Sequence, residues 1–454
     1  MAMPEPNTAI RIPAAAALLL ERLNRAGYGA YVVGGCVRDA LLGQEPHDWD
    51  VCTSALPEQV ETVFSDLRII ETGLKHGTVT VLAEDVPYEI TTFRTESGYS
   101  DHRRPDRVEF VPRLDRDLSR RDFTINAMAY HPAEGLVDLF GGREDLNRGL
   151  IRCVGDPDVR FGEDGLRLLR ALRFGARLGF AIEEATGASI HRNRELLQAI
   201  SAERIFSELK GLLTGQSAGR MLQAYADVIF TVLPELAPMA GFDQRSPHHD
   251  ADLWTHTCRA VDFAPPDTVL RLALLFHDCG KPQTFRLDEA GQGHFYGHEA
   301  AGAELAARCL NRLRSDNDTK HAVAELVRWH DTPIPQERRA LRRRVAKLGE
   351  ARVRQLLALR RADVLAQGAL DRPEKLARLE KAETALEALL REESCFGLKD
   401  LAVNGRDLIA LGYPAGPALG TVLRELLDGV LDERLGNDRD ALLAWAEQNL
   451  RKGG

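Results

Sequence analysis

The chain has 454 residues, of which 44% are apolar, and its formal net charge is −9. This length is too great for one ordinary domain and predicts two to four domains, each with its own core. The acidic balance excludes a protein that coats nucleic acid non-specifically, because such binding depends on Lys and Arg side chains that neutralise phosphates.

Two further features of the composition indicate where the protein works. The longest apolar run near the N-terminus, residues 14–20, is followed by charged residues and is too short to span a bilayer, so we expect no membrane anchor. The seven cysteines are scattered, odd in number and without the paired spacing of metal ligands. Free thiols in a reducing compartment are the simplest explanation, and we therefore expect a cytoplasmic protein.

The first informative segment, residues 32–53, joins a glycine pair to two acids. A short run of β-branched and aromatic residues ends at Gly34 and Gly35, and the residues after it are typical of the first turns of a helix. Asp48 and Asp50 alternate with apolar residues, so both carboxylates point to one face if this stretch is a strand. Two carboxylates on one face repel each other unless a cation lies between them.

A third acid, Glu89, shares a face with Thr91 in a second predicted strand and could bring its carboxylate to the same cation. Mg²⁺ prefers oxygen ligands and substrate phosphates, and two such ions together stabilise both oxygens of an in-line displacement. The pattern therefore favours transfer of a nucleotidyl or phosphoryl group. The alternative interpretation is a packing turn followed by acids on a solvated strand edge.

From residue 155 onward the sequence is typical of helices, and residues 163–180 are the most informative part. Asp164 and Arg167 lie three residues apart and can present a hydrogen-bond acceptor beside a donor. That pair complements the edge of cytosine and adenine, which offer an amine donor beside a ring-nitrogen acceptor, whereas uracil and guanine offer the reverse. The alternative is an ordinary salt bridge within a helix.

Two groups of basic residues could contact RNA despite the acidic net charge. One is the run at residues 338–347. The other is a stripe on one helical face, with spacings of three and four residues, made of Arg167, Arg170, Arg173 and Arg177. For each group the alternative is a solvated helix face whose charges pair with neighbouring acids.

Several long motifs resemble those of the bacterial class II tRNA nucleotidyltransferases, the CCA-adding branch of the poly(A) polymerase family. They are GGCVRDALLG and HDWDV, TGLKHGTVTV at residues 72–81, FRTESGYSDHRRP at residues 93–105, SRRDFTINAMA at residues 119–129 and EDGLRLLRALRFGARLGF at residues 163–180. The resemblance extends through SAERIFSEL to VNGRDLIALGYPAGPALG. It implies an α+β fold, composed of a nucleotidyltransferase head with a mixed β-sheet (residues 1–150), a mostly α-helical neck (residues 151–245), an HD-type helical body (residues 246–370) and a helical tail that binds tRNA (residues 371–454).

The resemblance also implies roles for individual residues. Asp48 and Asp50 would bind two Mg²⁺ ions and would act together with Glu89 as the catalytic acids. The nucleotide-binding residues that the resemblance implies are Gly34, Gly35, Arg38, Arg121, Asp122, Asn126, Glu163, Asp164, Arg167, Arg170 and Arg173.

Within this nucleotide-binding set the resemblance separates two tasks. The glycine pair and Arg38 would hold the triphosphate. Asp164 and Arg167 would read the incoming base, and Glu163 would orient Arg167 for that task.

The central region carries a second metal-binding pattern, since eight of the thirteen histidines lie within residues 248–330. His277 and Asp278 follow an apolar run, which is the pattern of the HD phosphohydrolase superfamily. His256 upstream and Asp363 downstream complete the ligand set of that superfamily. The pattern predicts a second metal site, separate from the acids of the head.

The metal of this second site is expected to differ from Mg²⁺. Imidazole and carboxylate ligands suit Mn, Fe, Ni or Zn better. His298 and His330 could complete a second metal position or bind phosphate. The alternative is a set of hydrogen-bonded histidines in a helical scaffold, so hydrolysis of phosphoesters stays open.

The expected function is addition of the 3′ CCA end to tRNA from CTP and ATP without a nucleic-acid template. The alternatives are addition of A alone or of CC alone, poly(A) synthesis, and phosphoester hydrolysis as the main activity. Residues 97–105 resemble the flexible loop needed for the switch to ATP, which disfavours a CC-adding enzyme. Residues 72–81 resemble the tRNA-specific branch, which disfavours a poly(A) polymerase. The sequence does not predict an oligomeric state.

Overall fold

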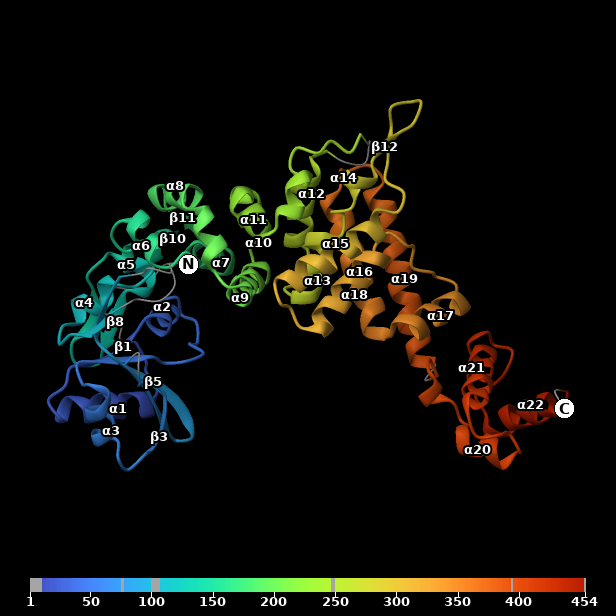
Figure 1. Ribbon diagram of the computed structural model, residues 1–454, viewed down its shortest axis with the longest axis horizontal. Helices are drawn as coiled ribbons and strands as arrows, with labels where there is room; N and C mark the ends of the chain where they lie inside the picture. The colour runs from blue at the N-terminus through green and yellow to red at the C-terminus, as the bar shows by residue number, and fades with distance from the viewer. Residues whose placement is uncertain (1–9, 75–76, 99–106, 246–249, 393–394, 453–454) are drawn as a thin grey trace. The chain divides into compact units, whose positions relative to one another are not determined.

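The computed structural model describes residues 10–74, 77–98, 107–245, 250–392 and 395–452. The chain separates into two compact units, Met1–Ala237 and Pro238–Gly454. Figure 1 shows a broad β-sheet in the first unit and a group of helices in the second. The expected α+β class, with a mixed-sheet head followed by helices, is confirmed. Among the described residues, no helix combines the length and the apolar character needed to cross a membrane.

A seven-stranded sheet forms the centre of the first unit, with the strand order β3-β4-β5-β2-β1-β8-β9. β2 and β5 run parallel, and the other neighbouring strands of this sheet are antiparallel. Residues of β4 alternate between buried and partly exposed, as expected for a strand with one face on the core. The strands are β1 (Ala30–Val33), β2 (Val51–Thr53), β3 (Arg68–Gly73), β4 (Thr78–Ala83), β5 (Val86–Thr92), β8 (Met128–His131) and β9 (Gly135–Asp138).

Helices cover the sheet and connect its strands. α1 (Ala14–Arg25) and α3 (Pro57–Val63) pack on the strands and against each other, while α2 (Gly35–Leu41) follows β1 directly and contacts β8. Leu19, Leu20 and Leu23 of α1 are buried, which is the apolar stripe of an amphipathic helix. The remaining elements of the head are β6 (Arg94–Ser97), β7 (Arg107–Phe110), α4 (Leu114–Ser119), the 3₁₀ helix η2 (Thr124–Asn126), α5 (Gly142–Arg148) and β10 (Leu150–Ile151).

The rest of the first unit is mostly helical, and its central contact joins α7 (Leu166–Leu178) to α9 (Ala202–Leu213). Gly215, just after α9, makes this contact close, because a Cβ there would lie 2.5 Å from the carbonyl carbon of Ala176. The other elements are α6 (Pro157–Glu163), β11 (Ala181–Ile182), α8 (Glu184–Arg192), η3 (Arg194–Ala199), α10 (Ala218–Ala224), α11 (Ala226–Val232) and η4 (Pro234–Met239), which reaches the boundary between the units.

The second unit is organised around one apolar helix, α13 (Thr268–Phe276). Residues 270–276 of α13 are all buried, since α12 (Leu253–Phe263), α16 (Asn317–Trp329) and α18 (Glu350–Ala366) pack around it. Figure 1 shows α13, α16 and α18 side by side. A helix buried on all sides ends in the interior, so the residues that follow it, His277 and Asp278, are placed inside the bundle.

The remaining elements of the second unit frame this bundle and form the C-terminal part. A short hairpin of β12 (Arg286–Leu287) and β13 (Gly293–His294) precedes α15 (His298–Arg312). A separate apolar cluster joins α20 (Gly405–Ala410), α21 (Pro417–Leu431) and α22 (Arg439–Lys452). The remaining helices are α14 (Lys281–Thr284), α17 (Arg338–Leu348), α19 (Arg372–Glu392) and η5 (Leu398–Asp400).

The basic run at residues 338–347 forms α17 and uses its charges inside the second unit. Arg339 and Arg343 both form ion pairs with Asp432, at 3.0 and 2.6 Å. Arg344 and Lys347 lie over the ring of Trp329, at 4.7 and 4.5 Å from its centroid. These contacts favour the alternative interpretation of the run, in which its charges pair within the protein.

Candidate functional site

Three acids of the head lie where the two parallel strands of the sheet meet. β2 pairs with β5 through Val51 and Ile90, so Asp50 and Glu89 occupy adjacent positions one residue before this pair. Glu89 lies in β5, as predicted. β2 begins only at Val51, so Asp48 and Asp50 precede the strand, whereas the sequence pattern placed them within it. The carbonyl of Asp50 accepts a hydrogen bond from the N–H of Val33 at 3.0 Å, which fixes it at the sheet.

The charges of this acid cluster, Asp48, Asp50 and Glu89, are not balanced by the chain alone. Burial, together with the negative charges of Asp48 and Glu89, raises the pKa of Asp50 to about 6, against the opposing effect of Arg121. A divalent cation would relieve this repulsion, and carboxylate oxygens are the ligands that Mg²⁺ prefers. The residues present therefore fit the metal ions that the sequence predicts here.

The glycine turn beside the acids uses the N–H group of its first glycine within the head. The N–H of Gly34 donates to the carbonyl of Met128 at 3.1 Å, so it is not available to a phosphate. What Gly34 contributes is space, because a Cβ there would lie 2.9 Å from Nη1 of Arg121 and its φ is 84°. The turn thus admits the guanidinium of Arg121, a side-chain cation, close to the acids.

Two other predicted nucleotide-binding residues, Arg38 and Asn126, bind each other. Nη1 of Arg38 donates to Oδ1 of Asn126 at 2.6 Å, and Nε of Arg38 donates to Asp39 at 2.8 Å. Arg38 is only 3% exposed. Its charge is therefore used to hold Asn126 and Asp39, and a direct contact with a triphosphate would fall to other groups.

Asp122 connects η2 to the arginines of α7. Its carboxylate accepts from Nε of Arg170 at 2.9 Å and from Nδ2 of Asn126 at 3.2 Å. Burial by itself raises the pKa of Asp122, but Arg170 and Arg167 outweigh this effect and lower the pKa to about 2. Asp122 is therefore a fully ionised structural partner of the predicted base-reading helix.

The arginine stripe of α7 is paired with acids along its whole length. Nη1 of Arg167 binds Glu163, Arg170 binds Asp122, and Nε of Arg173 lies 3.0 Å from Glu208 of α9. Arg177 lies 3.9 Å from Asp39. These contacts favour the alternative interpretation of the stripe, in which its arginines pair with neighbouring acids of the protein.

The predicted base-reading residues are held by partners from different elements. Asp164 lies between α6 and α7, where its carboxylate accepts from the N–H of Leu166 at 3.0 Å and from Arg204 at 2.8 Å. Nη1 of Arg167 donates to Glu163, the residue that is predicted to orient it. Asp164 and Arg167 thus flank the start of α7 and do not form an i,i+3 pair within one helix.

Two residues that the sequence analysis did not select complete this region. Phe174 of α7 has the guanidinium groups of Arg38, Arg170 and Arg173 over its ring, at 4.8 to 5.5 Å from the centroid. Glu208 is buried on the apolar face of α9 and binds two of these arginines. An acid within an apolar helix face is rare without a basic partner, and this was the available signal for Glu208.

The predicted ligands of the second unit are brought together by five helices, α12, α13, α15, α16 and α18. We call these residues, His256, His277, Asp278, His298, His330 and Asp363, the His–Asp cluster. Two groups within it have ligand atoms close enough to hold a metal ion, and Asp278 belongs to both. One group joins Asp278 to His256 and His277, and the other joins it to His298 and His330. Asp363 lies 3.0 Å from Nε2 of His256, next to the first group.

Backbone carbonyls turn three of the imidazoles toward Asp278. The Nδ1 atoms of His277, His298 and His330 each lie 2.7 to 2.9 Å from the carbonyl oxygen three residues earlier. A proton on Nδ1 leaves the lone pair on Nε2, and the Nε2 atoms lie 3.3 to 3.5 Å from the carboxylate of Asp278. Orientation of a ligand histidine by a carbonyl is usual around bound metals.

The electrostatics of the cluster also fit a cation. Burial alone lowers the pKa of His277, but Asp278 and Asp363 outweigh it and raise the pKa to about 10. The buried Nε2 of His277 has no hydrogen-bond partner among the described residues. A metal ion would supply the positive charge and the missing partner, so the residues fit the predicted metal.

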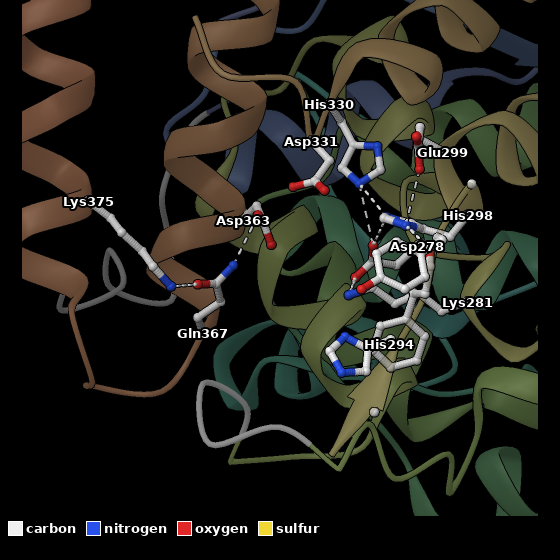
Figure 2. Close-up of a pocket in the computed structure, with 14 residues that line it drawn as sticks. Asp278, Lys281, His294, His298, Glu299, His330, Asp331, Asp363, Gln367 and Lys375 are labelled. Atoms are coloured by element: carbon white, nitrogen blue, oxygen red, sulfur yellow. Dashed lines mark hydrogen bonds and ion pairs between the residues drawn. The ribbon is translucent and has the colours of Figure 1, made fainter. Parts of the chain in front are cut away.

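A cavity of about 410 Å³ opens over the His–Asp cluster. Figure 2 shows Asp278, His298 and His330 meeting on one side of it, with Asp363, Gln367 and Lys375 on the other. Lys281 and Lys375 contribute ammonium groups to its lining. The site combines clustered metal-ligand groups with cations, a set suited to phosphate-containing ligands.

Three family models match the chain. They are "Poly A polymerase head domain" over residues 30–152, "Probable RNA and SrmB- binding site of polymerase A" over residues 179–239, and "tRNA nucleotidyltransferase domain 2" over residues 300–446. The first match contains the acid cluster, the glycine turn and Asp122. The head is therefore that of a nucleotidyltransferase of the poly(A) polymerase class.

Comparisons of the whole chain with relatives and with solved structures identify the family within this class. The CCA-adding enzyme of Limosilactobacillus reuteri is 36% identical over 445 residues, which cover 96% of each chain. The structure of the Bacillus stearothermophilus CCA-adding enzyme in complex with CTP is 31% identical, covers 96% of this chain and 97% of that chain, and gives a TM-score of 0.72. The Thermotoga maritima CCA-adding enzyme complexed with tRNA has the same fold, with a TM-score of 0.56, 20% identity and 97% coverage of both chains. The chain belongs to the family of CCA-adding enzymes.

The substitution Asp122→Asn is expected to destabilise the first unit in a pH-dependent way. Folding lowers the pKa of Asp122 from 3.8 to about 2, so its stabilisation is fully present above about pH 4 and is lost as the pH falls through 2. The shift corresponds to about 2 kcal/mol near neutral pH. Urea unfolding of the variant and the parent protein, near neutral pH and near pH 3, measures the difference.

The matched control is Asp66→Asn, which removes the exposed ion pair with Arg22 and should change the free energy of unfolding little. A stability difference between Asp122→Asn and the parent protein that is the same at both pH values would contradict the assignment of Asp122.

Proposed function

We propose that this chain restores the 3′ CCA end of tRNA by adding C, C and A from CTP and ATP without a template. The observation that carries the proposal is the acid cluster beside the glycine turn, in a chain that matches CCA-adding enzymes over 96% of its length. These relatives favour CCA addition over the A-adding and poly(A) alternatives. Residues 99–105, within the segment that resembles the ATP-switch loop, lie outside the described residues.

In this reaction the 3′ hydroxyl oxygen of tRNA attacks the α-phosphorus of the nucleotide. A new phosphodiester bond forms, the bond to the β-phosphate oxygen breaks, and pyrophosphate leaves while the hydroxyl proton is released. Nucleotidyltransferases use divalent metal ions, and at Asp48, Asp50 and Glu89 such ions, typically two Mg²⁺, would activate the hydroxyl and balance the charge of the leaving pyrophosphate.

The groups around the acids are assigned from the resemblance and from the contacts that each side chain makes. Arg121 binds Asp117 through Nη2 at 3.3 Å and places Nη1 beside Gly34. This Nη1 group and the backbone of Gly35 hold the triphosphate. Arg38 acts indirectly, because it positions Asn126, whose amide serves the ribose. Asp122, Arg170 and Arg173, with Glu208, hold α7 in place against the head.

Base selection falls to Asp164 and Arg167. The carboxylate accepts from the amine of cytosine or adenine, and the guanidinium donates to the adjacent ring nitrogen. Arg204 and Glu163 hold the two side chains in position from opposite sides of the α7 start. This fixed geometry requires no nucleic-acid template.

We also propose a division of the chain into four parts with separate roles. Head, neck, body and tail correspond to residues 1–150, 151–245, 246–370 and 371–454, with nucleotide chemistry in the head and neck and tRNA contacts in the tail. All seven cysteines are free thiols in the structure, which fits a reducing compartment, so we place the reaction in the cytoplasm.

The acid cluster is tested with Asp48→Ala and Asp50→Ala. Each variant should lower the rate of nucleotide addition at least about a hundredfold, because charge at the reacting phosphate is no longer balanced. The assay supplies tRNA ending before C, after C and after CC, with each nucleotide separately. Asp66→Asn is the control. Normal extension by either Ala variant would refute the metal assignment, and extension of only the last tRNA would replace CCA addition by A addition.

Base selection is tested with Asp164→Ala. The ratio of kcat/KM for CTP and ATP to that for UTP and GTP should fall about tenfold or more, because a charged hydrogen bond to the base is lost. Asp158→Asn, an exposed acid on α6, is the matched control and should keep the ratio. A variant that loses activity with all four nucleotides equally would show that Asp164 acts only through the fold.

A second activity is favoured by the geometry of the His–Asp cluster, namely metal-dependent hydrolysis of phosphoesters. Water would add its oxygen to phosphorus, the ester P–O bond would break, and the released alcohol would take a proton. The two ligand groups around Asp278 and the cationic cavity support this assignment. The ligand set suits Mn, Fe, Ni or Zn.

The two activities are separated by His277→Ala. This variant should lose bound transition metal, measured by elemental analysis, and should lower hydrolysis of glycerol 2-phosphate at least about a hundredfold while tRNA extension continues. Asp50→Ala should do the opposite. His321→Ala, an exposed histidine of α16, is the control. Unchanged metal content in the His277 variant would exclude the metal site.

A further inference from the structure

The carboxylate of Asp117 in α4 binds three groups of the head, although Asp117 is only 1% exposed. Its Oδ1 accepts from Nε and Nη2 of Arg120, at 3.0 and 2.8 Å. Its Oδ2 accepts from Nη2 of Arg121 at 3.3 Å. Oδ1 also accepts from the N–H of Arg94, the first residue of β6, at 3.3 Å. Two guanidinium groups and one backbone N–H thus meet at a single buried carboxylate.

The packing of α4 explains why this carboxylate is buried. Leu118, the next residue, lies in an apolar cluster with Val33 of β1. Burial by itself raises the pKa of Asp117, but Arg120 and Arg121 outweigh this effect and lower the pKa. Asp117 is therefore ionised near neutral pH, and its charge keeps both arginines next to the core of the head.

The contact with Arg121 directs that guanidinium toward the acid cluster. While Asp117 holds Nη2, Nη1 lies 2.9 Å from the place of a Cβ on Gly34. Arg121 is close enough to Asp50 to oppose the rise in the pKa of that acid. The buried Nε of Arg121 has no hydrogen-bond partner among the residues that the structure describes. The guanidinium therefore keeps a donor without a protein acceptor on the side of the metal-binding acids.

The contact with Arg120 fixes a backbone carbonyl that receives the predicted base-reading arginine. Nη2 of Arg167 donates to the carbonyl oxygen of Arg120 at 3.2 Å. Because Arg167 belongs to α7, this hydrogen bond joins the head to the neck. The position of Arg167 thus depends on a peptide group whose own side chain is anchored by Asp117.

We propose that Asp117 is a positioning residue that couples triphosphate binding to base selection. It acts on the triphosphate through Arg121, and on the base through Arg120 and Arg167. The inference rests on the proposed function, which assigns Arg121 to the triphosphate and Arg167 to the base. One buried charge thereby holds both ends of the nucleotide site, so its loss weakens the two tasks together.

The test is isothermal titration of the full chain with CTP, UTP and inorganic triphosphate, in Mg²⁺ and without tRNA. Asp117→Asn keeps an oxygen acceptor for the N–H of Arg94 and removes the charge that holds the two arginines. Kd for inorganic triphosphate should rise about tenfold, and the ratio of Kd for UTP to Kd for CTP should fall about tenfold, because each arm loses a charged hydrogen bond. Asp115→Asn, which changes a partly exposed acid of α4 that pairs with Arg113, is the matched control.

A second variant, Arg120→Ala, separates the two arms. It removes the side chain that anchors the carbonyl under Arg167 and leaves the contact between Asp117 and Arg121. The ratio of Kd for UTP to Kd for CTP should fall, whereas Kd for inorganic triphosphate should not change. In addition, Asp117→Asn should not weaken triphosphate binding further in a protein that already carries Arg121→Ala, since residues that act through one contact are not additive.

Additive effects of Asp117→Asn and Arg121→Ala on triphosphate binding would overturn the proposal, as would an unchanged ratio of Kd for UTP to Kd for CTP in Asp117→Asn. Partial unfolding lowers the number of titrated sites and leaves Kd of the folded molecules unchanged, so a loss of sites alone would also contradict it.

The proposed function is judged separately by tRNA extension. A parent protein that does not extend tRNA but shows the expected changes in Kd would remove CCA addition and keep the role of Asp117. Normal extension together with additive effects of the two substitutions would keep CCA addition and remove that role.

Discussion

Charge compensation of carboxylates away from water is the constraint on which both units depend. A buried carboxylate is unfavourable unless a cation lies next to it. At Asp122 the chain supplies that cation itself through Arg170, and the pKa is low. At Asp50 the nearest charges include two further acids, and the pKa is high. The ion pair of Asp122 with Arg170 stabilises the fold. The negative charge around Asp50 is not fully compensated by the chain and would be balanced by a metal ion.

In the neck, too, carboxylates whose charge is balanced by arginines hold the structure in position. Three guanidinium groups surround Phe174, and the acids Asp122 and Glu208 bind two of them. Cation–π contacts and ion pairs together fix arginines that would otherwise repel each other. α7 is thereby held against the head by charges that are already balanced. Arg167 and Asp164, at the start of α7, can then present their polar atoms in a fixed direction.

The sequence predicted those features whose cause is local. The turn at Gly34 and the strand that carries Glu89 follow from the spacing of nearby residues. The partner of Asp164 could not be predicted in this way, because Arg204 comes from another helix. The run at residues 338–347 was ambiguous for the same reason, since Asp432 is distant in sequence.

The buried position of α13 has a consequence for how the second unit responds to its surroundings. Asp278 follows a helix that is enclosed by its neighbours, so the cluster cannot adjust without disturbing the packing of the whole bundle. Any ion that binds the folded arrangement more tightly than the unfolded chain adds its binding free energy to that packing. A metal ion bound at the His–Asp cluster would therefore raise the thermal stability of the surrounding helices.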